Sequence, residues 1–128
     1  MSLEERGSLI VTDSILNSVK QLLGISEDNT DFDVNVITYI NSVFMILNQM
    51  GVGPDIPFVI SDETSTWHDF SDEINTMESV KAYIPLKVKI MFDPPTSSAT
   101  MDALKYIISE HEWRLNVLCD NTFQEGLA

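Results

Sequence analysis

Two adjacent prolines, Pro94 and Pro95, divide the last third of the chain and constrain its fold more than any other feature. Proline has no backbone N–H and its ring fixes φ, so a helix that reaches this pair must stop. Apolar residues on both sides recur every three to four positions, which is the spacing of one helical face. The sequence therefore predicts two amphipathic helices hinged at the prolines, and such helices must pack against something to bury their apolar faces.

The same periodicity predicts about four helices in a small bundle. The first begins near Thr12 or Asp13 and runs to residue 23, where Gly24 terminates it. The second begins at a capping box formed by Thr30 and Asp33 and ends before residues 51–54. The third spans about residues 72–92 and the fourth runs from residues 96–98 to about residue 118. Pro85 lies inside the third pattern, where it either kinks or ends the helix.

Residues 51–70, between the second and third helices, do not have helical periodicity. Residues 58–60 have strand propensity, which allows a short strand or a small hairpin there, and residues 61–65 are typical of a turn. So long a connection in a small domain is often functional. The sequence thus predicts a single all-α domain over residues 1–128, with flexible tails at residues 1–11 and 119–128.

Charge is strongly acidic and unevenly distributed along the chain. The formal net charge is -13, from 7 basic and 20 acidic residues. Residues 1–80 carry 2 basic and 14 acidic residues, whereas residues 81–128 carry 5 basic and 6 acidic residues. Because nucleic-acid affinity depends on cationic side chains that neutralise phosphates, this composition argues against DNA binding. The simpler interpretation is that the acidic residues keep a small domain in solution.

The remaining compositional features exclude several classes of protein. The single Cys119 excludes an intrachain disulfide and fits a reducing compartment. The polar start of the sequence has no apolar signal-peptide core. The longest aliphatic and aromatic run, residues 43–47, is far shorter than the ~20 residues that a membrane span needs. We therefore expect no membrane partner.

One acidic segment has part of the spacing of a calcium-binding loop. Asp31, Asp33 and Asn35 alternate as the first ligands of such a loop do. The motif also needs a glycine three places after the second ligand and a glutamate at its end, but Val36 and Ser42 stand there. We interpret this segment as the solvated start of a helix.

No other motif supports catalysis or a cofactor. His111 and Glu112 begin a zinc-protease motif, but Leu115 occupies the position of its second histidine. With two histidines and one cysteine, a zinc site is improbable. No phosphate-binding loop and no nucleophile motif occurs in the sequence. The chain is therefore expected to be a structural or adaptor protein without a metal or cofactor, and not an enzyme.

Four large or cationic side chains are candidate interface residues: Trp67, Phe70, Trp113 and Arg114. Trp67 and Phe70 fall in the polar connection, where such aromatics either cover the core or anchor a partner. Trp113 and Arg114 lie near the end of the last helix and present the same two alternatives. Tryptophan and arginine are the residue types enriched at interaction hot spots.

Four segments in order resemble the head–tail connector proteins, also called adaptor or head-completion proteins, of tailed bacteriophages and prophages. They are SVFMILNQMGVGP at residues 42–54, TWHDF at 66–70, VKAYIPLKVKIMFDPP at 80–95 and EWRLNV at 112–117. The resemblance implies a small all-helical subunit that assembles into a ring of about twelve copies beneath the portal protein. Pro85 departs from the uninterrupted helix of that family.

The resemblance also implies the partners and the location of the protein. The ring would extend the DNA channel, let DNA pass without specific binding, and offer a platform for the next neck or tail protein. It would belong to the virion neck, and to the host cytoplasm during assembly. The resemblance favours a C-terminal contact with the portal but does not fix its residues. From the nearly neutral charge of the C-terminal third and the anchor-type side chains of Trp113 and Arg114, we expect this contact at the end of the fourth helix and the tail after it. The alternative is a small acidic regulator that binds one protein partner, such as an anti-repressor or DNA mimic, and such a regulator would stay monomeric or dimeric.

Overall fold

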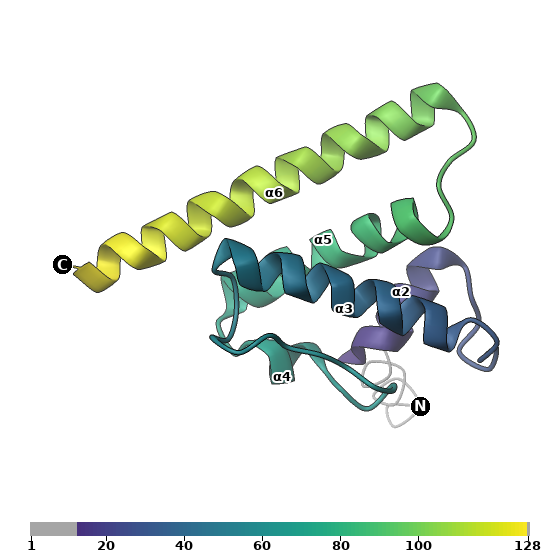
Figure 1. The fold of residues 1–128 in the computed structure, drawn as a ribbon, viewed down its shortest axis with the longest axis horizontal. Helices are drawn as coiled ribbons and strands as arrows, with labels where there is room; N and C mark the ends of the chain where they lie inside the picture. The colour runs from purple at the N-terminus through teal and green to yellow at the C-terminus, as the bar shows by residue number, and fades with distance from the viewer. Residues whose placement is uncertain (1–12, 128) are drawn as a thin grey trace, which may run out of the picture.

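The computed structural model describes the backbone of residues 13–127 and the side chains of residues 13–119. Within this part the chain is all-α, as predicted, with four long helices and one short one (Figure 1). They are α2 (Ile15–Leu23), α3 (Asp33–Met50), α4 (Trp67–Phe70), α5 (Ile74–Phe92) and α6 (Ser98–Leu127). The flexible segment predicted at residues 1–11 lies outside the described residues.

Helix α5 is the centre of the bundle, because it contacts each of the other helices. Helices α2 and α3 also contact each other, while α6 runs along one side and extends past the bundle toward the C-terminus (Figure 1). The core is one cluster of buried apolar side chains from all five helices and the α3–α4 segment. The predicted apolar faces supply most of it: Ile15, Leu16, Val19, Val36, Ile40, Val43, Phe44, Leu47, Val80, Ile84, Val88, Ile108 and Leu115.

Helix α2 begins one residue later than the predicted caps allow. Its N-cap is Ser14, whose Oγ accepts a hydrogen bond from the Asn17 N–H at 3.3 Å. The prediction of Asp13 as the cap is therefore wrong, and Thr12 lies outside the described residues. The predicted end is confirmed, since Gly24 caps α2 with φ of 80°, a left-handed conformation that glycine adopts without steric cost.

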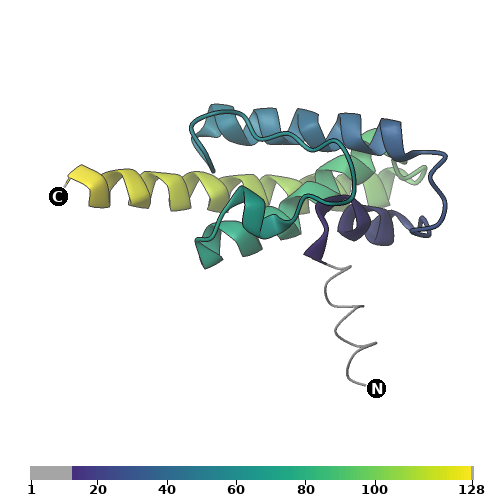
Figure 2. The same ribbon diagram turned by 90° about the horizontal axis from the view of Figure 1, so that it is seen from below.

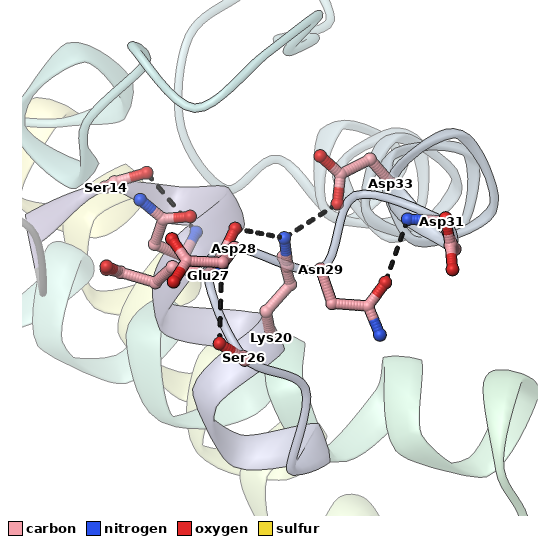
Figure 3. Close-up of polar contacts among 9 residues, drawn as sticks. Ser14, Lys20, Ser26, Glu27, Asp28, Asn29, Asp31 and Asp33 are labelled. Carbon is pink, nitrogen blue, oxygen red and sulfur yellow. Dashed lines mark hydrogen bonds and ion pairs between the residues drawn. The ribbon is translucent and has the colours of Figure 1, made fainter.

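Helix α3 lacks the predicted capping box. Its N-cap is Phe32, and no side chain caps the first N–H groups. The Asp33 carboxylate is engaged elsewhere, because its Oδ1 lies 2.8 Å from the buried Lys20 ammonium of α2 (Figure 3). The Lys20 Nζ also donates to the Glu27 carbonyl at 3.2 Å. This ion pair joins α2, the following loop and the start of α3.

The connection between α3 and α4 forms no strand in the described structure, so the short strand allowed by residues 58–60 is absent. An isolated bridge pairs Ser14 with Thr66 instead. The connection ends in α4, where Thr66 and Asp69 form a capping box.

Pro85 lies inside α5 and does not end it, because the helix continues to Phe92. The side chain of Pro85 is buried in the core. Glu73 caps the start of α5, its carboxylate accepting from the Asn75 and Thr76 N–H groups. These two hydrogen bonds hold the pKa of Glu73 below its usual value, and the bond from the Asn75 N–H is the larger cause.

Helix α6 is longer than predicted, since it continues beyond Leu118 to Leu127. It packs on α5 through Ile108 and Leu115, which are buried. A polar contact crosses the same interface, where the Tyr83 Oη donates to the Glu112 Oε2 at 2.7 Å. Burial is the larger cause of the raised pKa of Tyr83, and the neighbouring Glu112 carboxylate raises it further. The hydroxyl therefore keeps its proton and remains a hydrogen-bond donor. Among the described side chains of α6, those buried against the bundle thus lie on one side of the helix.

Candidate functional site

Two of the four predicted interface residues belong to the core. The Trp67 indole is fully buried and its Nε1 donates to the Ser18 Oγ at 3.2 Å. Phe70 is also buried, with its ring centroid 5.0 Å from that of Phe44 and 5.4 Å from that of Phe58. Because both rings are buried in the core, the structure fits the core-cover alternative for Trp67 and Phe70.

The other two residues, Trp113 and Arg114, lie on the exposed side of α6. Trp113 is 64% exposed, and Tyr106, seven residues earlier, is 67% exposed. A seven-residue separation returns to nearly the same face of a helix, about 10.5 Å along its axis. Ile107 is exposed beside them. We call this face the α6 surface and define it by Lys105, Tyr106, Ile107, Glu110, Trp113 and Arg114.

The α6 surface carries two cations, Lys105 and Arg114, that lie outside the described ion pairs, as Lys81 of α5 also does. Within the described residues, Lys20, Lys87 and Lys89 each form an ion pair with an acidic side chain. No described ion pair includes Lys105 or Arg114. In a chain with a net charge of -13, a helix face with exposed aromatics and two cations differs sharply from the rest of the surface. Such a face is suited to contact an acidic or neutral protein surface.

A second exposed apolar patch lies on the α3–α4 connection. Ile56 is 78% exposed and Val59 is 63% exposed. Acidic side chains flank them, and residues 54–66 contain no lysine or arginine. We call this patch the loop surface and define it by Asp55, Ile56, Val59, Asp62 and Glu63.

Side chains of α3 hold the loop surface in a fixed conformation. Asn41 makes two hydrogen bonds with the backbone of Ile60, accepting from its N–H at 2.8 Å and donating to its carbonyl at 3.0 Å. Asn48 donates to the carbonyls of Pro54 and Asp55. Between these points the Phe58 ring packs on the core aromatics. The connection is therefore an ordered segment that presents Ile56 and Val59 outward.

The far end of the same connection is fixed to α2. The Ser14 Oγ donates to the Glu63 carbonyl at 2.6 Å, and the Ile15 N–H donates to the Ser65 carbonyl at 3.0 Å. The Asp62 carboxylate accepts from the Thr64 side chain and backbone, and the side-chain bond is the larger cause of its lowered pKa. Asp62 therefore stays ionised at neutral pH, which keeps the loop surface negative.

A cavity of about 590 Å³ lies where the end of α6 passes the start of the connection. Its lining includes Val52, Phe70, Glu73, Leu118 and Cys119. The Cys119 thiol donates to the Gly51 carbonyl at 3.4 Å, and the Glu73 carboxylate is occupied as a helix cap. Neither group is paired with a base or a nucleophile, so this lining does not form a catalytic arrangement.

The described residues contain no group of three or more histidine, cysteine, aspartate or glutamate side chains that could hold a metal ion. No helix in this part of the chain combines the length and the apolar character needed to cross a membrane. The α6 surface and the loop surface are therefore the candidate sites that the described residues present, on an acidic helical bundle.

Of the six residues that define the α6 surface, the sequence indicated two, Trp113 and Arg114, and it indicated none of the apolar residues of the loop surface. Tyr106 could have been found from its seven-residue distance to Trp113, which lies on the opposite side of the helix from Ile108 and Leu115. Ile56 and Val59 have no comparable signal. Apolar residues in an irregular segment can point inward, as Phe58 and Ile60 do, or outward, and no periodicity distinguishes them.

The model of the phage connector protein family matches residues 15–122, which include the whole described bundle up to the last turns of α6. No curated protein and no solved structure matches the chain.

Proposed function

Because the chain belongs to the phage connector protein family, a structural family with no indication of catalysis, we propose that it is a head–tail connector subunit of a tailed phage or prophage. Copies assemble into a ring of about twelve beneath the portal protein, as cyclic symmetry allows for any pair of complementary faces. The ring extends the DNA channel and supports the next neck or tail protein. The protein acts in the virion neck and assembles in the host cytoplasm.

The observation that carries this proposal is the unused face of α6. Over its described side chains, α6 packs on one side and exposes Tyr106 and Trp113 on the other, which leaves apolar area that a partner would cover. No catalytic or metal-binding arrangement competes with this interpretation in the described part of the chain. The proposal therefore rests on surfaces and not on a chemical centre.

The portal contact is assigned to the end of α6. Residues 81–128 carry 5 basic and 6 acidic residues, so they approach another protein with less repulsion than the rest of the chain. Helix α6 also reaches beyond the bundle at this end (Figure 1). Its last turns are free to enter a groove on a larger ring while the bundle stays folded.

Truncation after Cys119 tests this assignment. The variant keeps the Cys119 contact with Gly51 and the buried residues Ile108 and Leu115 of α6, so its melting temperature should stay close to that of the full chain. Far-UV circular dichroism should record only the loss of the last helical turns. Binding to the cognate portal ring, measured by co-sedimentation, should weaken by at least tenfold.

Two outcomes contradict the proposal at different levels. A truncated chain that binds portal as tightly as the full chain moves the contact away from the end of α6. A full-length chain that forms no higher oligomer at high concentration, and none with a cognate portal, rejects the connector function itself. A mass of one or two copies under both conditions would instead favour the small acidic regulator.

A further inference from the structure

We propose that neighbouring copies of this chain contact each other head to tail, with the α6 surface of one copy on the loop surface of the next. The inference rests on the proposed function, because it names the two faces through which the ring would form. It assigns Tyr106, Trp113 and Arg114 to the neighbouring copy and leaves the last turns of α6 to the portal.

The first argument is the position of the two surfaces. In Figure 1, α6 runs along the upper edge of the molecule and the α3–α4 connection along the lower edge. Figure 2, seen from below, shows the connection in front and α6 behind the bundle. In a two-fold symmetric dimer, both copies contribute the same surface patch to the interface. Two different faces on opposite sides of one chain cannot pair in that way. They produce a heterologous contact, which builds rings or filaments.

The second argument is charge. Two copies with a net charge of -13 each repel one another unless the contacting faces compensate. The α6 surface carries two cations, Lys105 and Arg114, and one carboxylate, Glu110, so its formal charge is positive. Neither cation has an acidic partner among the described ion pairs. The loop surface carries only acidic charges. Placing the two together pairs the free cations of one copy with the carboxylates of the next, whereas contact between two loop surfaces would be repulsive.

The third argument is fit. Tyr106 and Trp113 are separated by about 10.5 Å along the axis of α6. Ile56 and Val59 are separated by three residues, which an extended chain spans in at most about 10 Å. The two apolar pairs can therefore lie opposite each other in a single register. The loop is also held by Asn41, which lowers the conformational entropy lost on contact.

Mixing two variants tests the head-to-tail arrangement. One variant, Trp113→Ala with Arg114→Glu, loses the α6 surface, and the other, Ile56→Asp with Val59→Asp, loses the loop surface. All four side chains are exposed, so both variants should keep the melting temperature of the parent chain. Each variant alone should stay monomeric, but an equimolar mixture should form a dimer and stop there, because only one intact interface can form. Sedimentation velocity distinguishes this dimer from larger species.

The single substitution Trp113→Ala should weaken self-association about thirtyfold, the loss typical of an aromatic hot spot. Gln49→Ala, which changes an exposed polar residue of α3 outside both surfaces, is the matched control and should have no effect. A mixture that stays monomeric, or one that forms species larger than a dimer, overturns the head-to-tail arrangement.

Chemical cross-linking gives a second readout that works at weak affinity. In a Cys119→Ser background, a chain with Tyr106→Cys is mixed with a chain carrying Val59→Cys and treated with a flexible bismaleimide. The mixture should yield a cross-linked dimer, while either variant alone, or Tyr106→Cys mixed with Gln49→Cys, should not. If the Val59 pair gives no more product than the Gln49 pair, the proposed contact is wrong.

These results separate the inference from the function on which it depends. Failure of the cross-link in a chain that still assembles with the portal rejects the two surfaces and keeps the connector. Absence of any assembly with the portal rejects the connector, as stated above.

Discussion

Replacement of Asp33 by alanine should destabilise the bundle more than any substitution of an exposed acidic residue. Lys20 is only 1% exposed, and its ammonium has two described partners, the Asp33 carboxylate at 2.8 Å and the Glu27 carbonyl at 3.2 Å (Figure 3). Asp33→Ala leaves this cation buried with one neutral acceptor. A buried charge without a counter-ion is strongly unfavourable, because the interior solvates it far less than water does.

The expected loss follows from the geometry of the pair. Removal of one partner of a buried ion pair costs about 3–5 kcal/mol. The side chain of Asp33 is 23% exposed and Lys20 keeps the Glu27 carbonyl, so we expect the lower end, about 3 kcal/mol. For a chain of this length the unfolding entropy converts this loss into a melting temperature lower by about 11 °C.

The assay is chemical denaturation followed by far-UV circular dichroism. Lys20→Met should cost less than Asp33→Ala, because it removes the charge and keeps an apolar side chain of similar length. The double variant should recover much of the loss. Asp28→Ala, a neighbouring exposed carboxylate without an ion pair among those described, is the control and should change the unfolding free energy by less than about 0.5 kcal/mol. The reasoning is refuted if Asp33→Ala costs no more than this control, or if Lys20→Met costs as much as Asp33→Ala.

Three further predictions follow from the core, the caps and the charge. Leu115→Ala should lower the free energy of unfolding by about 2–4 kcal/mol, because Leu115 is buried between α6 and α5, and denaturation should show a much smaller loss for Asn116→Ala. The depressed pKa values of Glu73 and Asp62 mean that their contribution to stability is complete above the usual carboxyl values of 4.5 and 3.8 and is lost as the pH falls through the folded-state pKa. Melting temperature should therefore fall on acidification, and Glu73→Gln should reduce that fall; an unchanged pH profile would contradict the assignment. The chain should not shift duplex DNA in a gel even at low salt, since its charge repels phosphates, and tight, salt-sensitive binding would be inconsistent with a channel that lets DNA pass.

The sequence alone determined the class of fold and most of the helices. Apolar residues at helical spacing identified the buried faces of α2, α3 and α5, because a helix that packs on a core must repeat its contacts every three to four residues. Gly24 and Gly51 identified two helix ends, since a left-handed residue at that position favours glycine. Four ordered segments were enough to indicate the connector family. These signals come from residues that are close together in the sequence, so they do not depend on how distant parts of the chain pack.

Other features depended on what each residue meets in three dimensions. Asp33 was expected to close a capping box, but the buried ammonium of Lys20 competes for its carboxylate. Pro85 was expected to kink or end a helix, and α5 does not end there; it continues to Phe92 with the proline side chain buried in the core. Residues 119–127 were expected to be a tail, but α6 continues through them, because no proline or capping glycine stops it before Leu127.

The candidate interface shows the same limit most clearly. In the sequence, Trp67 and Trp113 could not be distinguished. Each is a large aromatic residue that could either pack in the core or contact a partner. Tertiary structure buried Trp67 beneath α2, where Ser18 accepts its N–H, and left Trp113 on the side of α6 that faces away from α5. Burial depends on which elements come together across the whole chain, and that is set by the summed packing of the core and not by the identity of the residue.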